Sequence, residues 1–397
     1  AELASYKKIE LPMSFCLNNI KAEGETMAAL KGYKGVLDMA LAHFRMDEKT
    51  LEAMWTAIRE ALPEVREYFK AKGRLLGHEN GLPFYDLFAP VGQSTRTYTV
   101  EEARALLLDL FGRFCPEMGD MMRAAFDEGW IDMYPREGKS GGAWCGNFTE
   151  QYYENGERVA PVVGVVTNYA RPTRSTPTLL NLDETKTLFH EFGHALHSLF
   201  RKVEYRGLAD VEGDFVELPS QLMENWATEK EFLDLWAVNY QTGEPIPAEI
   251  VERIIAAQNY LAAYLNVRQL SFGLTDMAWH TITEPFEGDV EQFEVASMAP
   301  SQVQPVVPGT AMAPAFGHIF SGGYAAGYYG YKWAEVLEAD AFSLFKEKGI
   351  FNREVSGSFR ENILSKGGTE HPMELYVRFR GHKPETKALI EKMGLGK

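Results

Sequence analysis

The stretch His-Glu-Phe-Gly-His at residues 190–194 carries the side chains of this sequence that are best suited to chemistry. It lies in an apolar run with helical spacing, so His190 and His194 fall on one helical face, one turn apart. Two imidazoles placed in this way can bind one metal ion, and Glu191 can reach a water on that ion without binding the ion itself. Gly193 weakens a helix, which suggests that another segment packs closely there. The pattern predicts a catalytic zinc site with its own general base.

A catalytic zinc ion takes three protein ligands, so the third must come from elsewhere in the chain. His197 follows on the same helix, but a straight helix cannot wrap three successive turns around one ion, and we interpret this residue as part of the core or as a partner of a ligand. The segment 213–226 is a better source. Its Pro219 suits the first turn of a helix, and Glu217 and Glu224 lie seven residues apart on one face of that helix.

A second group of polar side chains lies at residues 318–331. Tyr324, Tyr328 and Tyr331 have the spacing of one helical face, within a helix that we expect from residue 323 to residue 345. Aromatic residues with this spacing usually form a core, yet each buried phenol needs a hydrogen-bond partner. A substrate pocket would supply one. Together with His318, the phenols are suitable donors to the oxyanion that forms during peptide hydrolysis.

The elements that must position these residues are mainly helices. Helical periodicity covers residues 27–77, a new helix is expected after Pro63, and a capping box at Thr99 begins another helix. Residues 133–169 mix small, aromatic and β-branched residues around a turn-like Glu-Asn-Gly-Glu, which predicts a small antiparallel sheet. Helices resume from the histidine stretch to the end. We expect a helical lobe segment at 1–132 and a catalytic region at 133–397, together one unit.

Composition narrows the classes of partner. The 397 residues are 45% hydrophobic and carry a formal net charge of −16, which is unfavourable for binding nucleic acid or an anionic membrane surface. No apolar run is long enough to span a membrane and no signal peptide is recognisable, so we expect a cytoplasmic protein. Three scattered cysteines do not make a disulfide framework. The sequence does not indicate an oligomeric state.

The combined segments FHEFGHALHSLF, DFVELPSQLMENW and HIFSGGYAAGYYGYKWAEV resemble the thimet oligopeptidase family of zinc metallopeptidases, which includes oligopeptidase A and the dipeptidyl carboxypeptidases. The resemblance covers most of the chain and the catalytic region of the family, without the helical region that usually precedes it. It implies a mainly α, zincin-like fold with two helical lobes around a substrate channel, and one Zn²⁺ per chain.

The resemblance also implies roles for individual residues. The third zinc ligand would be Glu217, joining His190 and His194. If so, Glu224 either orients a histidine, as metal-bound imidazoles usually require, or is a partly exposed surface residue. His318, Tyr324 and Tyr331 would contact the region of the scissile carbonyl, with Tyr328 in the pocket wall. The segment GGAWCGNF is similar to the family's substrate-binding edge strand. Gly142 and Ala143 would let the backbone of a peptide approach, although two adjacent glycines can also mark a simple turn.

The function expected from these features is hydrolysis of internal bonds in short peptides, with Glu191 taking the proton of a zinc-bound water. One alternative is a carboxypeptidase that releases C-terminal dipeptides, which needs a cation such as Arg171 or Arg174 to bind a free carboxylate. Others are an amidase, or a relative that binds zinc and peptides without catalysis. The last is disfavoured, because Glu191 has no purpose in a structural zinc site and such a site prefers four protein ligands.

Overall fold

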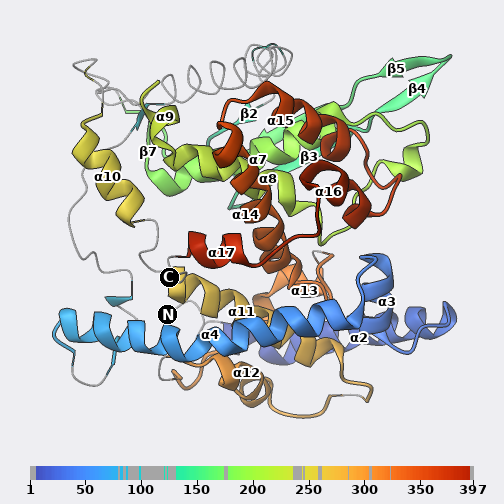
Figure 1. The fold of residues 1–397 in the computed structure, drawn as a ribbon. Coiled ribbons are helices and arrows are strands. Elements are labelled where there is room, and N and C mark those ends of the chain that lie inside the picture. The colour runs from blue at the N-terminus through green and yellow to red at the C-terminus, as the bar shows by residue number, and fades with distance from the viewer. Residues whose placement is uncertain are drawn as a thin grey trace. The chain divides into compact units, whose positions relative to one another are not determined.

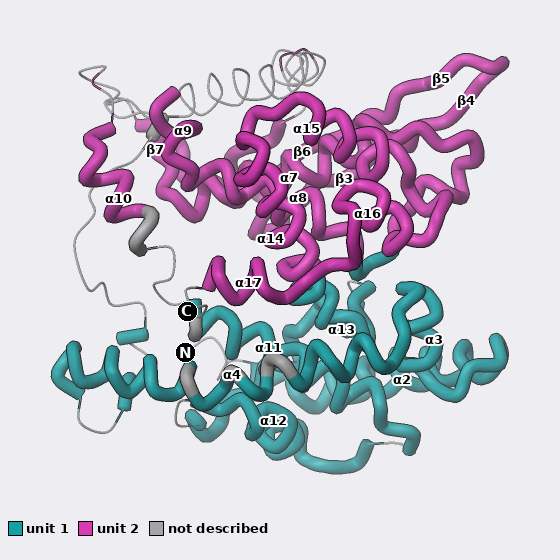
Figure 2. Tube along the Cα trace, in the orientation of Figure 1, with its two compact units in different colours: residues 1–92, 212–214, 260–333 teal, residues 93–211, 215–259, 334–397 magenta. Residues whose placement is uncertain are grey.

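The computed structural model describes residues 6–78, 81–83, 86–87, 98–99, 120, 123, 131–173, 178–235, 244, 246–257, 262–284, 286–303, 306–321 and 323–393. These residues are mainly helical with a small sheet, as the sequence predicts (Figure 1). Their contacts divide the chain into two compact units. Unit 1 holds residues 1–92, 212–214 and 260–333, and unit 2 holds residues 93–211, 215–259 and 334–397 (Figure 2). The expected division at residue 132 stays a prediction.

Unit 1 is built from helices around an aromatic core. Its elements are η1 (Lys7–Ile9), α2 (Glu10–Leu30), α3 (Val36–His43), α4 (Glu48–Leu75), α11 (Ala262–His280), α12 (Val290–Met298), η5 (Ala299–Ser301), η6 (Ala313–Ala315), α13 (Gly317–Phe320) and the start of α14 (Gly330–Lys348). Trp55 and Phe69 of α4 are buried in the same cluster as Leu270 of α11. This contact joins the N-terminal helices to the helices after residue 260.

Helix α4 corrects one expectation, because it does not restart at Pro63. Asp47 caps its first turn by accepting a hydrogen bond from the Thr50 amide at 2.9 Å, and the helix then continues through Pro63 to Leu75. A proline inside a helix removes one main-chain hydrogen bond. Leu62 and Val65, on either side of Pro63, are both buried in the core of unit 1, and this packing keeps the two halves in one helix.

Unit 2 contains the sheet and the histidine helix. Its strands are β1 (Tyr98–Thr99), β2 (Ile131–Asp132), β3 (Trp144–Thr149), β4 (Tyr152–Glu154), β5 (Glu157–Val159), β6 (Val162–Val166) and β7 (Leu179–Leu180). Its helices are α7 (Leu182–Phe200), η3 (Arg206–Leu208), α8 (Glu217–Glu224), η4 (Asn225–Thr228), α9 (Lys230–Leu233), α10 (Ala248–Ala257), the rest of α14, α15 (Arg353–Phe359), η7 (Arg360–Leu364), α16 (Pro372–Arg380) and α17 (Lys387–Lys392). Thr99 ends β1, whereas Glu102 and the helix expected after Thr99 lie outside the described residues.

The small sheet forms where the sequence predicts it, between residues 131 and 166. Its three strands lie in the order β2-β6-β3, with β3 antiparallel to β6, so β3 is an edge strand. Strand β2 runs parallel to β6, which makes the sheet mixed rather than wholly antiparallel. The predicted turn closes the β4–β5 hairpin, where Asn155 and Gly156 both have the positive φ that tight hairpin turns require.

The aromatic segment before α14 is not the helix that its spacing suggests. Helix α14 begins at Gly330, so Tyr324 and Tyr328 lie in turns and only Tyr331 lies in the helix. The expected start at residue 323 is wrong because Gly323 has a φ of 88° and Ala326 a φ of 51°, and neither value continues a right-handed helix.

Helices α7 and α8 approach each other at Gly193. A β-carbon on Gly193 would lie 2.4 Å from Cα of Ser220 and 2.6 Å from the carbonyl oxygen of Pro219, both in the backbone of α8. Only a glycine permits this distance. The close packing predicted from Gly193 is therefore confirmed, and it sets the position of α8 on α7.

We expect Gly193→Ala to lower the free energy of unfolding by about 1–3 kcal/mol, because the added methyl group overlaps the backbone of α8. Gly357→Ala in α15 is the matched control, since a β-carbon there meets no atom within 4 Å and alanine favours a helix by up to about 1 kcal/mol. Urea unfolding of the two variants and the wild type measures both effects. A Gly193→Ala protein as stable as the wild type would show that the two helices can separate freely.

Residues Glu212–Asp214 belong to unit 1, although the chain on both sides belongs to unit 2. Arg45 forms an ion pair with Glu212 at 2.9 Å, and a β-carbon on Gly330 would lie 3.2 Å from Cα of Asp214. The Asp214 side chain is buried, and this burial together with the nearby charge of Glu212 raises its pKa to about 7. The usual pKa of an aspartate is about 3.9.

This raised pKa makes stability depend on pH. Between about pH 4 and pH 7 the folded protein holds a proton on Asp214 that the unfolded chain has released, so stability falls as the pH rises through this window. We expect Asp214→Asn, which stays neutral, to gain stability relative to the wild type when urea unfolding is moved from pH 5 to pH 8. The exposed helix cap Asp289, changed to Asn, is the control. An equal difference at both pH values for Asp214→Asn would contradict the assignment.

Candidate metal centre and its surroundings

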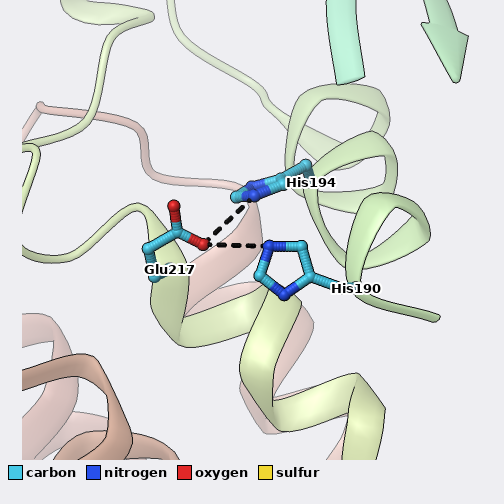
Figure 3. Close-up of side chains that lie close together, drawn as sticks. All are labelled: His190, His194 and Glu217. Atoms are coloured by element: carbon cyan, nitrogen blue, oxygen red, sulfur yellow. Dashed lines mark ion pairs between the residues drawn. The ribbon is translucent and has the colours of Figure 1, made fainter. Parts of the chain in front are cut away.

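The structure brings His190, His194 and Glu217 together in unit 2 (Figure 3). Helix α7 holds both histidines and begins with a capping box, in which Asn181 and Glu184 satisfy each other's main-chain amides at 2.9 Å. Helix α8 begins at Glu217 and crosses α7 at Gly193. The carboxylate of Glu217 therefore arrives beside the two imidazoles because the helices can pack closely there.

The three side chains have the geometry of a metal site. Nε2 of His190 and Nε2 of His194 each lie 3.2 Å from the same oxygen, Oε2 of Glu217. Ligands that bind zinc tetrahedrally at 2.0–2.1 Å are about 3.3 Å from one another. Two imidazole nitrogens and a carboxylate oxygen are also a ligand set that zinc prefers. The residues present therefore fit a zinc ion. The structure brings together the three residues that the sequence groups, and their role as ligands stays a prediction.

Glu224 contacts His190 through the ring nitrogen that does not face Glu217. Its Oε1 lies 2.8 Å from Nδ1 of His190, so the ring can donate from Nδ1 and keep Nε2 for a cation. Ser220 has a similar relation to the carboxylate, because its hydroxyl donates to Oε2 of Glu217 at 2.8 Å. The sequence predicts Glu224 as a candidate partner of a histidine, whereas Ser220 is not among the predicted residues. Ser220 follows Glu217 by three residues, a spacing that places the two side chains on one face of a helix. This spacing could have indicated the contact.

The electrostatics of the site favour a positive charge at His190. Burial disfavours protonation of His190, but hydrogen bonds and charges from Glu217 and Glu224 outweigh it and raise its pKa to about 10. Burial also acts against ionisation of Glu217, yet its hydrogen bonds to the two histidines keep its pKa well below the usual range. A metal ion would replace the proton that these groups share, and would release it to solvent.

Glu191 is placed for proton transfer. It is 6% exposed, and its Oε2 is buried without a hydrogen-bond partner among the described residues. Burial raises its pKa, and the two neighbouring histidines partly oppose this rise. A buried carboxylate with a free oxygen can accept a proton from a water molecule beside it.

His197 is a core residue. It is 2% exposed, and burial keeps its pKa well below the usual value for histidine. It does not belong to the metal-ligand group found in the described part of the chain. Its burial agrees with the interpretation as a core residue, and its exclusion from the ligand set stays a prediction.

His318, Tyr324, Tyr328 and Tyr331 come together in unit 1. The rings of Tyr324 and Tyr331 stack at 5.1 Å between centroids, and those of Tyr328 and Tyr331 lie 5.2 Å apart. His318 is exposed and lies 6.0–6.5 Å from all three tyrosine rings. The predicted cluster forms, although turns and not one helical face produce it.

The edge strand β3 presents exposed aromatic side chains. Phe148 is 76% exposed and Trp144 is 37% exposed. Gly142 and Ala143 lie just before the strand. Gly142 has a φ of 83°, and its carbonyl oxygen accepts a hydrogen bond from Asn168 at 2.7 Å, so this glycine forms part of a turn. A β-carbon at Gly142 would meet no atom within 4 Å, so its outer side is open.

Among the described residues, no helix is long and apolar enough to cross a membrane.

The model of a protein family described as Peptidase family M3 matches residues 1–395. Oligopeptidase A of Escherichia coli is 46% identical over 273 residues, which cover 67% of this chain and 40% of that protein. Dipeptidyl carboxypeptidase of the same organism is 40% identical over 268 residues, which cover 66% of this chain and 39% of that protein. The chain thus spans about 40% of the length of these relatives.

Solved structures with low sequence identity share the fold. A structure titled PZ peptidase A with inhibitor 2 has a TM-score of 0.70 at 16% identity, over 98% of this chain and 65% of that chain. The M32 carboxypeptidase from Deinococcus radiodurans has a TM-score of 0.64 at 16% identity, over 99% of this chain and 77% of that chain. With the family match over nearly all of its length, the chain belongs to peptidase family M3.

Proposed function

We propose that this chain is the catalytic part of a zinc-dependent oligopeptidase that hydrolyses internal bonds of short peptides. The observation that carries the proposal is the position of Nε2 of His190 and Nε2 of His194, each 3.2 Å from the same oxygen of Glu217, on the helix that also holds Glu191. The family membership and the similarity to oligopeptidase A support it.

In this proposal His190, His194 and Glu217 hold one zinc ion. A bound zinc ion would supply Lewis acidity, polarising the scissile carbonyl and lowering the pKa of the attacking water. Glu191 accepts the proton of that water on its free carboxylate oxygen and then passes it to the nitrogen of the leaving amine. Its burial supports this role, because a raised pKa lets the carboxyl keep the proton between the two steps.

The tyrosine cluster supplies hydrogen-bond donors. Tyr324 and Tyr331 are partly exposed and their rings stack, so their hydroxyl groups can be presented to a substrate together. With His318 they would stabilise the oxyanion that develops on the peptide carbonyl, while Tyr328, which is 7% exposed, supports them from the core.

Strand β3 would bind the backbone of the substrate. It is an edge of its sheet, and an extended peptide can add to such an edge through main-chain hydrogen bonds with little sequence preference. Gly142 and Ala143, which carry little or no side chain, leave room at the start of this edge. We also propose a cytoplasmic location, which is consistent with the relative named probable cytosolic oligopeptidase A of Arabidopsis thaliana.

Removal of C-terminal dipeptides is a second candidate activity, favoured by the 40% identity to dipeptidyl carboxypeptidase. Arg171 can be considered as the carboxylate-binding group. It is held by a hydrogen bond to the carbonyl oxygen of Pro135 at 3.0 Å and lies over the ring of Tyr134. Arg174 lies outside the described residues. Peptides with an amidated C-terminus separate the two activities, because an endopeptidase cleaves them and a dipeptidyl carboxypeptidase requires the free carboxylate.

We expect Glu224→Ala to weaken zinc binding by about 10–100-fold, because Nδ1 of His190 loses the carboxylate that orients the ring. Glu224→Gln keeps an acceptor and should lose less. Glu231→Ala, an exposed residue of α9, is the control. Competition with a chelator of known affinity measures the dissociation constants. Unchanged zinc affinity in Glu224→Ala would remove Glu224 from the site.

We expect Glu191→Gln to keep its zinc and to lose about 10²–10⁴-fold in kcat/KM on quenched fluorescent peptides, because the amide cannot accept the proton of water. Glu184→Gln on the same helix is the matched control, since glutamine can also serve in a capping box. Removing zinc with a chelator should abolish cleavage, and adding it back should restore it. Zinc-loaded wild-type protein that binds the peptides and leaves them intact would favour a non-catalytic protein.

A further inference from the structure

The turn that carries the tyrosine cluster has a backbone that its own sequence does not favour. Ala326, midway between Tyr324 and Tyr328, has a φ of 51°. An L-residue other than glycine, asparagine or aspartate rarely takes this left-handed conformation, and it persists only where the surroundings hold it. Such residues concentrate at functional sites. The question is therefore which group holds this turn.

Asp276 of α11 holds this turn by accepting two of its main-chain amides. The residue is 0% exposed, and its two carboxylate oxygens are used separately. Oδ1 accepts the main-chain amide of Ala326 and Oδ2 accepts that of Tyr328, both at 2.9 Å. His280, one turn later on α11, places its Nδ1 2.7 Å from Oδ1 and 2.9 Å from the main-chain oxygen of Asp276. Asp276 thus binds the strained residue and the tyrosine two positions after it.

Glycine contacts fix the same turn on its other side. A β-carbon on Gly327 would lie 2.5 Å from the ring of Phe44, and one on Gly330 would lie 3.2 Å from Cα of Asp214. The turn is therefore held between a buried carboxylate and a buried phenyl ring. The spacing of the rings of Tyr324, Tyr328 and Tyr331 depends on this arrangement, because the turn links the three residues.

We propose that Asp276 is a positioning residue for the peptidase reaction, acting through the main-chain amides of Ala326 and Tyr328. It keeps residues 324–331 in the one backbone conformation that presents the phenols of Tyr324 and Tyr331 together. The proposal rests on the proposed function, since it assigns these phenols to the oxyanion. Asp276 itself is fully buried and lies outside the metal-ligand group of the described residues.

The test compares Asp276→Asn with the wild type as zinc-loaded proteins. Asparagine has the same size, but its Nδ2 group cannot accept an amide hydrogen, so one of the two contacts is lost. We expect kcat to fall about 10–100-fold with KM changed less than about twofold. Misplaced donors stabilise the transition state less, while they change the binding of the substrate in its ground state little. Zinc affinity should not change. Adding Ala326→Gly to this variant should restore part of kcat, since glycine takes a positive φ without strain.

Glu294→Gln is the matched control. Glu294 is also a buried carboxylate of unit 1 that accepts main-chain amides, those of Met312 and Ala313 at 2.7–2.9 Å, but it does not bind the tyrosine turn. We expect it to lower the melting temperature as much as Asp276→Asn does, with kcat within about threefold of the wild type. Equal losses of kcat in the two variants would reduce Asp276 to a general stabilising role and overturn the proposal.

Hydrogen exchange on the unaltered protein tests the anchor without any variant. The amides of Ala326 and Tyr328 should exchange as slowly as those in the middle of α11, because both are bonded to a fully buried group. Fast exchange at these two amides would overturn the proposal even if Asp276→Asn does not fold. An inactive wild type with slow exchange at both amides would refute the proposed function and the positioning role, and would leave only the structural anchor.

Discussion

The arrangement of the site depends on one close contact, the approach of the backbone of α8 to Gly193 of α7. The histidines on α7 are fixed by the helix, but their partner carboxylate comes from another element and must reach within 3.2 Å of both rings. A side chain at position 193 would hold α8 away and move Glu217 with it. A glycine inside a helix costs up to about 1 kcal/mol relative to alanine, and here that cost permits a distance that no other residue allows.

The charges around His190 and His194 are consistent with a site built for a cation. Glu217 lies between the two rings and Glu224 lies behind one of them, so carboxylates approach the imidazoles from two directions. Glu191 and Glu217 are buried, and Glu224 is partly exposed beside them. Burying carboxylates in this way is unfavourable unless positive charge compensates them. The raised pKa of His190 and the lowered pKa of Glu217 both show that positive charge beside these carboxylates is stabilising. A dication would compensate these carboxylates better than a proton, because its charge would be shared by the three ligands His190, His194 and Glu217.

Sequence reasoning succeeded where the relevant geometry is local. The positions of His190, Glu191 and His194 follow from the pitch of one helix, and the alternation of small, aromatic and β-branched residues located the sheet with its edge strand β3. It failed at Pro63 and at the start of α14, where tertiary contacts override the local signal. The spacing of the tyrosines fits one continuous helix as well as it fits the observed turn that precedes α14. Nothing near them in the sequence indicates that a carboxylate about fifty residues earlier binds the amides of the turn.

Buried carboxylates fix the backbone conformation of two loops in unit 1. Burying a charge is costly unless several hydrogen bonds replace water, so a buried aspartate or glutamate is tolerated only where donors meet it in one geometry. Asp276 meets two main-chain amides and His280, and Glu294 meets two main-chain amides of the segment before α13. Apolar packing could bury these loops in several similar ways, whereas a carboxylate with two fixed donors accepts only one. The turn that carries the tyrosines therefore has its conformation set by the carboxylate of Asp276 on α11 together with the ring of Phe44, whereas the carboxylate of Glu294 on α12 fixes the separate segment around Met312 and Ala313.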